Sequence, residues 1–370
     1  MSDAAELGAD GPFLQVDDLT TTFATPRGPL RAVDGVSLSV AKGRTLGIVG
    51  ESGSGKTVLA RTIMNLLPRR GVESTGRVRL GGEDILGRSA KQMRGVWGTQ
   101  VAMVFQDPMT SLNPVVKIGR QVTESLRFAH GTRRAAAKEQ AVTLLEEVGI
   151  PDARRRMRGY PGEMSGGMRQ RVVIAIALAG EPQLLMADEP TTALDVTVQA
   201  QILDLLEQEQ HERSMAMVLV THDLGVVANR TDEIAVMYAG QVVEKASTAA
   251  LFGGVRMPYT EALLKSIPRL EQPSHTRMLA LPGRPPDLTN PPPGCRFAPR
   301  CPYAQQRCTV EQPPLVELAP GHMVRCWFPV GTAAGDGALD ANRRAGLLDE
   351  ATDPAAVEVP VLDHASLGST

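Results

Sequence analysis

The feature that most constrains this chain is a glycine-rich octapeptide at residues 50–57, which reads G-E-S-G-S-G-K-T. It matches the phosphate-binding loop pattern G-x-x-x-x-G-K-[ST], and its residues are Gly50, Glu51, Ser52, Gly53, Ser54, Gly55, Lys56 and Thr57. An apolar run ending at Val49 predicts a buried parallel strand before the loop, and residues 58–67 predict a helix that Pro68 ends. Lys56 is expected to reach the β- and γ-phosphates, and the Thr57 hydroxyl to ligate Mg²⁺. The predicted ligand is therefore a nucleoside triphosphate with Mg²⁺.

Composition narrows the class of protein. The chain has 370 residues and a formal net charge of −2, so no overall basic field favours nucleic acid as a partner. No apolar run approaches the roughly 20 residues needed to span a bilayer. Residues 1–12 are acidic and lack the basic and apolar parts of a secretory signal. We expect a soluble, cytosolic protein that reaches a membrane only through a partner.

The order of predicted elements indicates a parallel α/β core with a small antiparallel β region ahead of the loop. The segments that carry this prediction are strand-like runs in 13–49, a helical stretch over 107–162, a helix after Ser165, strands at 183–187 and 216–220, and a helix at 196–210. Arginines at 154–156 and 158 are expected to form a solvated face. No internal repeat is present, which indicates one nucleotide-binding unit per chain.

Two carboxylates follow the second strand of this core. The run Leu-Leu-Met-Ala at 184–187 ends in Asp188 and Glu189. A strand of this kind delivers a carboxylate, here Asp188, to Mg²⁺ at the carboxyl edge of the sheet. Glu189 would then orient or deprotonate a water. An acidic pair alone is most often an ordinary strand end, so the prediction depends on its pairing with the phosphate-binding loop.

A second anion-binding helix start lies at Ser165, Gly166 and Gly167. One nucleotide does not need two such loops from one subunit. At this point the chain resembles the ATP-binding subunits of ABC transporters, in which the S-G-G signature of one subunit closes on the ATP held by the other. The resemblance covers about residues 13–255, and the motifs occur in the family's order.

The resemblance implies further roles. Phe23 matches the aromatic residue that stacks on adenine, with a core phenylalanine as the alternative. Gln106 matches the glutamine that contacts Mg²⁺ and links to the helical subdomain, and Asp195 belongs to the loop that crosses between subunits. His222 matches the switch histidine at the γ-phosphate. Methionines replace the outer residues of the commonest L-S-G-G-Q signature, but the Ser-Gly-Gly atoms that touch phosphate are kept.

The C-terminal region resembles one branch of this family. Residues 106–114, Q-D-P-M-T-S-L-N-P, and the Pro258-Tyr259-Thr260 run resemble dipeptide and oligopeptide importers, a branch that includes nickel importers. The resulting division is an ABC nucleotide-binding domain at 12–257 with a helical subdomain at about 107–162, an extension at 258–330, and a tail at 331–370. The tail is expected to be disordered because it is rich in Ala, Gly and Asp, has an excess of acidic residues and lacks aromatic residues.

All four cysteines, Cys295, Cys301, Cys308 and Cys326, lie in the extension with the spacing C-x₅-C-x₆-C-x₁₇-C. Four thiolates suit an iron–sulfur cluster, and some family members with this extension carry a [4Fe–4S] cluster. Unliganded cysteines rank second, and zinc ranks third because the tight pairs typical of zinc are absent. His322 lies nearby and is expected to be a surface residue rather than a ligand.

The resemblance implies an ATPase subunit that energises a bacterial ABC importer for dipeptides or oligopeptides. Its expected partners are a second ABC ATPase subunit, usually a homologous different chain, two transmembrane permease subunits and an extracytoplasmic substrate-binding protein. Its expected place is the cytoplasmic face of the membrane, as a peripheral subunit. The alternatives are a nickel importer ATPase, a soluble ABC ATPase acting in DNA repair or translation, and a subunit that binds ATP without hydrolysing it.

Overall fold

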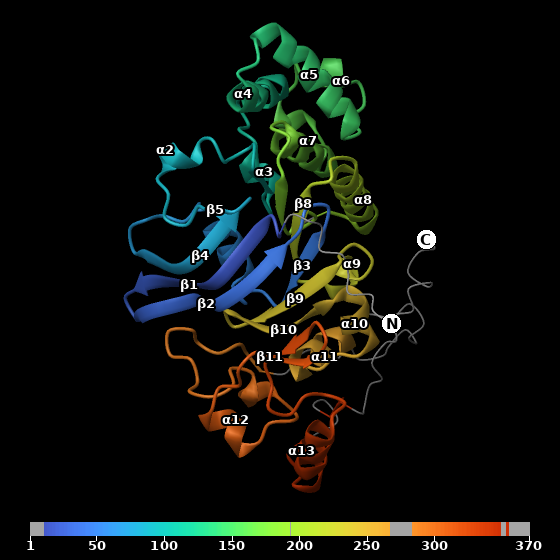
Figure 1. The fold of residues 1–370 in the computed structure, drawn as a ribbon. Helices are drawn as coiled ribbons and strands as arrows, with labels where there is room; N and C mark the ends of the chain where they lie inside the picture. Colours follow the sequence, from blue (N-terminus) through green and yellow to red (C-terminus); the bar gives the residue numbers. More distant parts are fainter. Residues whose placement is uncertain (1–10, 193, 267–282, 349–352, 355–370) are drawn as a thin grey trace.

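The computed structural model describes residues 11–192, 194–266, 283–348 and 353–354. Three parts follow one another along the long axis of the molecule: a helical lobe, a central body of two sheets, and the C-terminal region (Figure 1). Within the described residues, no helix is both long enough and apolar enough to cross a bilayer.

The larger sheet has eight strands and forms the centre of the body. In spatial order they are β11 (Val316–Ala319), β12 (His322–Val324), β10 (Gln241–Ser247), β9 (Glu233–Tyr238), β3 (Thr45–Val49), β8 (Ala216–Thr221), β7 (Leu184–Asp188) and β6 (Val101–Val104). The five strands from β9 to β6 are parallel. Every residue of β3, β6, β7 and β8 is buried, as expected for parallel strands covered on both faces.

The smaller sheet is antiparallel and confirms the β region expected before the loop. Its order is β2 (Gly28–Val40), β1 (Leu14–Thr25), β4 (Val72–Leu80) and β5 (Glu83–Asp84). Buried apolar residues of β1, such as Leu14 and Val16, alternate with more exposed ones and share a core with helix α1 (Lys56–Ile63). Helix α1 ends four residues before the predicted end, because Asn65 takes a left-handed backbone conformation with φ of 55°.

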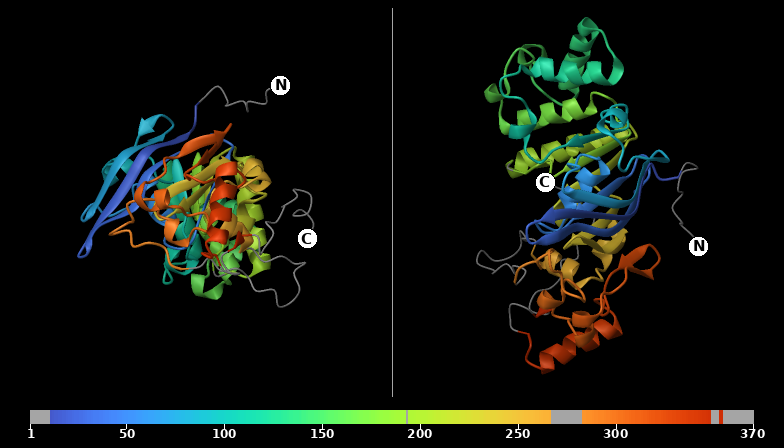
Figure 2. Two further views of the ribbon diagram at one scale, coloured as in Figure 1. Left: turned by 90° about the horizontal axis from the view of Figure 1, so that it is seen from below. Right: turned by 90° about the vertical axis from the view of Figure 1, so that its left-hand side faces the viewer.

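The helical lobe follows β6. Its helices, with those that lead back to the sheet, are α3 (Pro108–Ser111), α4 (Ile118–His130), α5 (Arg134–Glu147), α6 (Ala153–Arg156), α7 (Gly166–Leu178) and α8 (Val196–Glu212). Figure 2 shows this lobe projecting beyond the edge of the sheet. The helical stretch predicted over residues 107–162 is therefore present.

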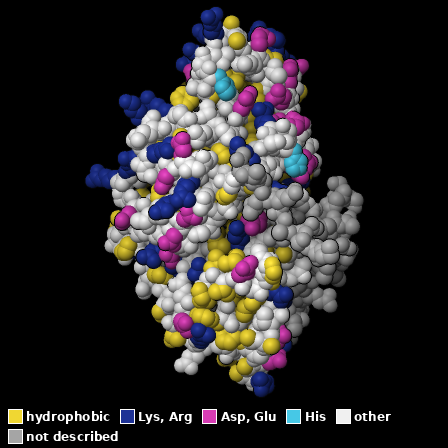
Figure 3. All heavy atoms as spheres, viewed as in Figure 1, with side chains coloured by type: hydrophobic (Ala, Val, Ile, Leu, Met, Phe, Trp, Pro, Cys, Tyr) yellow, Lys and Arg dark blue, Asp and Glu magenta, His cyan; other side chains and the backbone are white. Residues whose placement is uncertain are grey.

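The C-terminal region extends the main sheet rather than hanging from it. Strand β12 pairs with β10 through Glu244–Val324 and Lys245–Met323, and Phe297 belongs to the main core. The remaining short helices are α2 (Ala90–Met93), α9 (Leu224–Val227), α10 (Thr248–Gly253), α11 (Pro258–Lys265) and α12 (Gln306–Val310). Figure 3 shows hydrophobic side chains gathered over this end of the molecule, where Val310 and Val316 are among the exposed large apolar residues.

The expected disorder of residues 331–370 is wrong for the part that the structure describes. Residues 333–344 form helix α13 (Ala333–Arg344), which the Thr332 side chain caps by accepting from the Gly335 N–H. Asn342 is buried and donates to the carbonyls of Pro302 and Ala304 at 2.8 and 3.0 Å. The alanine content that counted toward disorder also gives strong helix propensity, and the anchoring contacts come from a segment about forty residues away in sequence. Most of residues 349–370 lies outside the described residues.

Candidate functional site

The phosphate-binding loop joins the C-terminal end of β3 to the start of α1. A Cβ added at Gly50 would lie 2.1 Å from the Met237 carbonyl oxygen, and Gly55 has a φ of +103°, so both positions need glycine. Lys56 is 4% exposed, and its Nζ donates to the carbonyls of Gly50 and Glu51 at 2.7 and 3.1 Å. The backbone carbonyls of the loop thus bind the side chain of its own lysine, Lys56.

Two features of the loop fit a bound phosphate. Burial lowers the pKa of Lys56, although the carboxylates of Glu189, Asp188 and Glu51 oppose the shift. The buried Ser54 hydroxyl has no hydrogen-bond partner within the described residues. An anion here would supply an acceptor to the Ser54 hydroxyl and a counter-charge to Lys56.

A hydroxyl and a carboxylate meet beside the loop, as predicted for a Mg²⁺ site. Thr57 Oγ1 donates to Asp188 Oδ1 at 3.0 Å. Burial raises the pKa of Asp188, and the hydrogen bond from Thr57 opposes that shift. Oxygen donors of this kind suit Mg²⁺, and a divalent cation would stabilise the charged carboxylate.

Glu189 collects three of the residues predicted for the site or adjacent to it. Its Oε2 accepts from Gln106 Nε2 at 2.9 Å and from Thr192 Oγ1 at 2.9 Å, and lies 3.4 Å from Nδ1 of His222. Its backbone has a φ of 47°, a conformation that costs free energy in a non-glycine residue and is held here by the N–H donating to Val220. The ends of β6, β7 and β8 therefore bring one carboxylate, one amide and one imidazole to the same edge of the sheet.

The signature lies apart from this group. The Ser165 side chain caps α7 by accepting from the Met168 N–H, and a Cβ at Gly167 would come within 2.6 Å of Val198. Asp195 caps α8. No hydrogen bond in the described structure joins Ser165 or Asp195 to the phosphate-binding loop, so within one chain these predicted residues do not complete the site. Ala193, two residues before Asp195, lies outside the described residues.

Comparison with known proteins identifies the family. A model described as ABC transporter matches residues 33–192, and one described as oligopeptide/dipeptide transporter, C-terminal region, matches residues 243–308. The oligopeptide transport ATP-binding protein OppD of Bacillus subtilis is 50% identical over 85% of this chain and 88% of its own length. The chain belongs to the ABC transporter family.

Other relatives agree with this ABC assignment. The dipeptide transport ATP-binding protein DppD of Escherichia coli is 47% identical over 87% of this chain and 98% of its own length. Among solved structures, the dimeric ATP-binding cassette MJ0796 with ADP and phosphate bound has a TM-score of 0.57 at 26% identity. It covers 64% of this chain and 98% of its own length, so about a third of this ABC protein has no counterpart in that cassette.

Phe23 lies on β1 of this ABC protein, between Leu30 of β2 and Val72 of β4, and is half-buried. A half-buried ring is compatible with stacking on a base and with simple packing, so its assignment to adenine stays a prediction.

The four cysteines surround one cavity, although they come from separate segments. Cys295, Cys301, Cys308 and Cys326 all line it, together with Phe297 and Trp327. All four are free thiols. The Cys295 N–H donates to the Cys308 carbonyl at 2.7 Å, which joins the first and third cysteine segments.

The cavity is apolar and narrow. Burial raises the pKa of Cys295 and Cys301, with neighbouring thiols adding to the shift, and raises the pKa of Cys326 to about 12. The free space is about 10 Å³, close to the least that one water needs. Among the described residues, no group of three or more His, Cys, Asp or Glu is arranged to hold a metal ion. The cysteines are therefore neighbours without forming a ready-made ion site.

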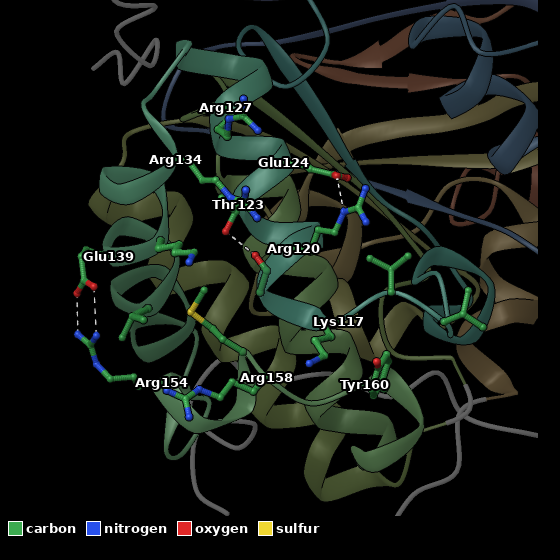
Figure 4. A pocket seen from close by; sticks show the side chains of 16 residues that line it. Lys117, Arg120, Thr123, Glu124, Arg127, Arg134, Glu139, Arg154, Arg158 and Tyr160 are labelled. Carbon is green, nitrogen blue, oxygen red and sulfur yellow. Dashed lines mark hydrogen bonds and ion pairs between the residues drawn. The ribbon is translucent and has the colours of Figure 1, made fainter.

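The helical lobe carries a hollow of about 900 Å³ between α4, α5 and α6 (Figure 4). Its two carboxylates are each occupied by an arginine: Glu124 accepts from Arg120 at 2.9 Å and Glu139 from Arg154 at 2.6 Å. The other charged side chains that line it are Lys117, Arg127, Arg134, Lys138 and Arg158. The arginine run expected to be a solvated face thus contributes to a positively charged hollow.

Sequence reasoning missed several residues at or near the nucleotide site. Thr192 contacts Glu189, and the Tyr259 hydroxyl accepts from the Glu51 N–H at 2.8 Å. Tyr259 belongs to the Pro258-Tyr259-Thr260 run that supported the family resemblance. Its contact with Glu51 could not be predicted, because the two residues are far apart in sequence. The expectation that His322 lies on the surface is wrong: it is 5% exposed and its Nε2 is 2.7 Å from the fully buried Glu244.

Proposed function

We propose that this chain is the ATP-hydrolysing subunit of a bacterial ABC importer for dipeptides or oligopeptides, peripheral to the membrane on its cytoplasmic face. The observation that carries the proposal is the convergence of Gln106, Asp188, Glu189 and His222 beside the phosphate-binding loop. The peptide substrate is supported by relatives that match most of the chain and are named for oligopeptide and dipeptide transport.

In the proposed reaction, the residues of this chain act on ATP in fixed roles. Lys56 exchanges its bonds to loop carbonyls for the β- and γ-phosphate oxygens and stabilises the charge that develops there. Glu189 orients and deprotonates the attacking water. Gln106 and His222 hold the Glu189 carboxylate, and His222 also acts at the γ-phosphate. Thr57 and Asp188 would hold Mg²⁺, which supplies charge neutralisation when bound.

We propose that Ser165, Gly166, Gly167 and Asp195 act on the ATP of a partner subunit. The support is their separation from the loop within one chain and the dimeric form of the MJ0796 cassette. The expected partner is a second ABC ATPase subunit, usually a homologous different chain. Activity should then fall on dilution of the isolated chain and return when the partner is added, whereas full activity from a demonstrated monomer contradicts this part.

The decisive experiment is reconstitution with the permease subunits and the substrate-binding protein in vesicles. Peptide-dependent ATP hydrolysis and uptake of labelled di- or oligopeptide are the expected result. Uptake of Ni²⁺ without peptide uptake would favour the alternative nickel importer. ATP hydrolysis that responds to neither substrate nor permease would favour a soluble ABC ATPase.

We propose that the membrane subunits dock on the positively charged hollow of the helical lobe. Val115 is 80% exposed and Tyr160 39% exposed on its lining, so apolar side chains reach the surface there beside cationic ones. Val115→Glu should weaken permease-stimulated hydrolysis while ATP binding is kept. Val310→Glu, at a 66% exposed valine in the C-terminal region, is the matched control.

We propose, as a finer assignment, that the four cysteines hold a [4Fe–4S] cluster. The support is the donor set, four thiols around one cavity. Because the free space is about 10 Å³, loading has to widen the cavity, and because burial raises the thiol pKa values, it has to release protons. Protein purified without oxygen should be brown, with about four irons per chain. Colourless protein, with zinc or with four titratable thiols, contradicts the cluster.

A further inference from the structure

The segment at residues 295–301 joins the cysteine cavity to the nucleotide site. It is a compact turn, because Ala298 N–H donates to the Cys295 carbonyl at 3.0 Å and Arg300 N–H to the Phe297 carbonyl at 2.9 Å. Cys295 and Cys301, the first and last residues of this segment, both line the cavity. The arginine next to each cysteine instead reaches the nucleotide-binding body.

Arg300 makes a two-pronged contact with the phosphate-binding loop. Its Nη1 and Nη2 donate to the two carboxylate oxygens of Glu51 at 2.8 and 3.0 Å. The Arg300 side chain is 4% exposed and that of Glu51 25% exposed. Paired planar groups of this kind are the strongest and most directional ion pairs. Burial is the largest influence on the pKa of Arg300 and lowers it, but the hydrogen bonds and charges of Glu51 and Tyr238 together outweigh burial and raise that pKa.

Tyr259 fixes the backbone of the same residue. Its hydroxyl accepts from the Glu51 N–H at 2.8 Å. Its ring packs against Tyr238 and Phe297, with centroids 4.6 and 5.4 Å apart, and Phe297 lies on the cysteine cavity. Both the side chain and the backbone of Glu51 are therefore held by residues from outside the nucleotide-binding motifs.

The neighbouring arginine braces the far side of the loop. Arg296 donates to the Asp34 carboxylate and to the Ala239 carbonyl. The adjacent Gly240 N–H donates to the Ser54 carbonyl at 2.8 Å, so this brace reaches the loop through one residue.

The charge of Glu51 gives Arg300 a task beyond packing. The Glu51 carbonyl accepts from Lys56, and the Glu51 carboxylate acts electrostatically on that lysine, so it lies near the place of the triphosphate. An unpaired carboxylate there would repel ATP. We propose that Arg300, with Tyr259, is a positioning residue for ATP: it neutralises Glu51 and holds the phosphate-binding loop in its binding shape.

This inference rests on the proposed role of the loop in ATP binding, and it gives the C-terminal region a part in the nucleotide site. It also gives the cysteine cavity a route to that site. Anything larger than a water that enters a cavity of about 10 Å³ has to move its wall. Four residues of the 295–301 segment are part of that wall: Cys295, Phe297, Ala298 and Cys301.

The test measures binding of a fluorescent ATP analogue to the full chain, in metal-free protein so that the outcome does not depend on a cluster. Arg300→Met should weaken binding about tenfold, because it leaves the Glu51 charge uncompensated. In the double variant Arg300→Met/Glu51→Gln the repulsion is gone, so binding should return to within about threefold of wild type. In the assembled transporter, Arg300→Met should raise KM and leave kcat nearly unchanged.

Arg325→Met is the matched control, since Arg325 is a partly buried arginine of the same region that bonds only carbonyls of Val242 and Pro313 among the described residues. It should leave ATP affinity unchanged even if it lowers the melting temperature. The proposal is overturned if Arg300→Met binds ATP like wild type, or if the double variant binds as weakly as Arg300→Met or more weakly. A wild-type chain that does not bind ATP would instead contradict the proposed function.

Discussion

The nucleotide site and the cysteine cavity gather similar numbers of reactive groups by different means. At the nucleotide site, the ends of adjacent parallel strands deliver Gln106, Asp188, Glu189 and His222 to one edge, where they bond to each other or to the loop. At the cavity, four thiols arrive on irregular segments and a short helix, and they surround a space without being bonded through their sulfurs to one another. The side chains of the first site are therefore already bonded to one another or to the loop, whereas the thiols of the second site only line the same cavity.

The two sites differ in how firmly the fold fixes the positions of their reactive side chains. Glu189 accepts three polar contacts in a backbone conformation that costs free energy, so its position is over-determined by the fold. The thiols face an apolar cavity that resists charge, and the hydrogen bonds to their sulfurs come from backbone N–H groups, such as that of Phe328 to Cys326 at 3.3 Å. Variants should therefore damage chemistry at the first site and stability at the second.

The largest effect is expected from Glu189→Gln. The amide keeps the size of the side chain but cannot accept a proton from water, so ATP hydrolysis by the assembled transporter should fall at least 100-fold while ATP binding persists. Glu181→Gln is a matched control, because Glu181 also has a left-handed backbone, with φ of 51°, but is exposed and is not among the residues that contact Glu189. Hydrolysis at the wild-type rate, with the partner's own site inactivated, would contradict the role of Glu189.

The strand, turn and helix pattern together with the family resemblance named Gln106, Asp188, Glu189 and His222, which the structure brings to one edge of the sheet and whose roles stay predictions. It did not allow prediction of Thr192, Tyr259 or Arg300, whose contacts depend on side-chain direction and on chain segments up to 249 residues apart. The family resemblance pointed to the cysteines as a group, but not to their narrow apolar cavity. Helix α13 was missed because composition was read without the buried contacts of Asn342.

A smaller effect, on stability alone, is expected from Cys301→Ser in metal-free protein. The hydroxyl would face an apolar cavity that barely has the space of one water, which should cost about 2 kcal/mol of unfolding free energy in a urea titration. Cys301→Ala removes the sulfur without adding a polar group and should cost less. If the serine variant proves as stable as the alanine variant, the cavity is wetter than its lining indicates.

Asn342→Ala should weaken the attachment of α13 to the cavity region, with a smaller loss of stability than Cys301→Ser. Alanine improves helix propensity, but the carbonyls of Pro302 and Ala304 lose their donor, and Gln305 keeps only the Ala338 carbonyl of its two acceptors. We expect a loss of about 1–2 kcal/mol and faster hydrogen exchange in residues 333–344. Arg344→Ala, at an exposed position of the same helix, should change neither quantity measurably. An unchanged exchange rate in Asn342→Ala would mean that α13 is held by its apolar face alone.

The smallest effect concerns pH and tests whether the cavity excludes charge. The pKa of Cys326 is about 12 in the folded protein against an ordinary value of 9.0, so folding favours the protonated thiol. That stabilisation is complete below about pH 9 and is lost as the pH rises through 9 toward 12, because the unfolded chain ionises first. Between pH 8 and 9.5 the loss attributable to this thiol is about 0.8 kcal/mol, from the difference between the two pKa values. Urea titrations of metal-free wild type and Cys326→Ser at both pH values isolate it, since the other thiols are common to both chains. The wild type should lose more stability than the variant by that amount. Equal losses would show that the Cys326 sulfur ionises as easily in the folded protein as in the unfolded chain. The cavity would then accept charge as the nucleotide site does, and the two sites would differ only in geometry.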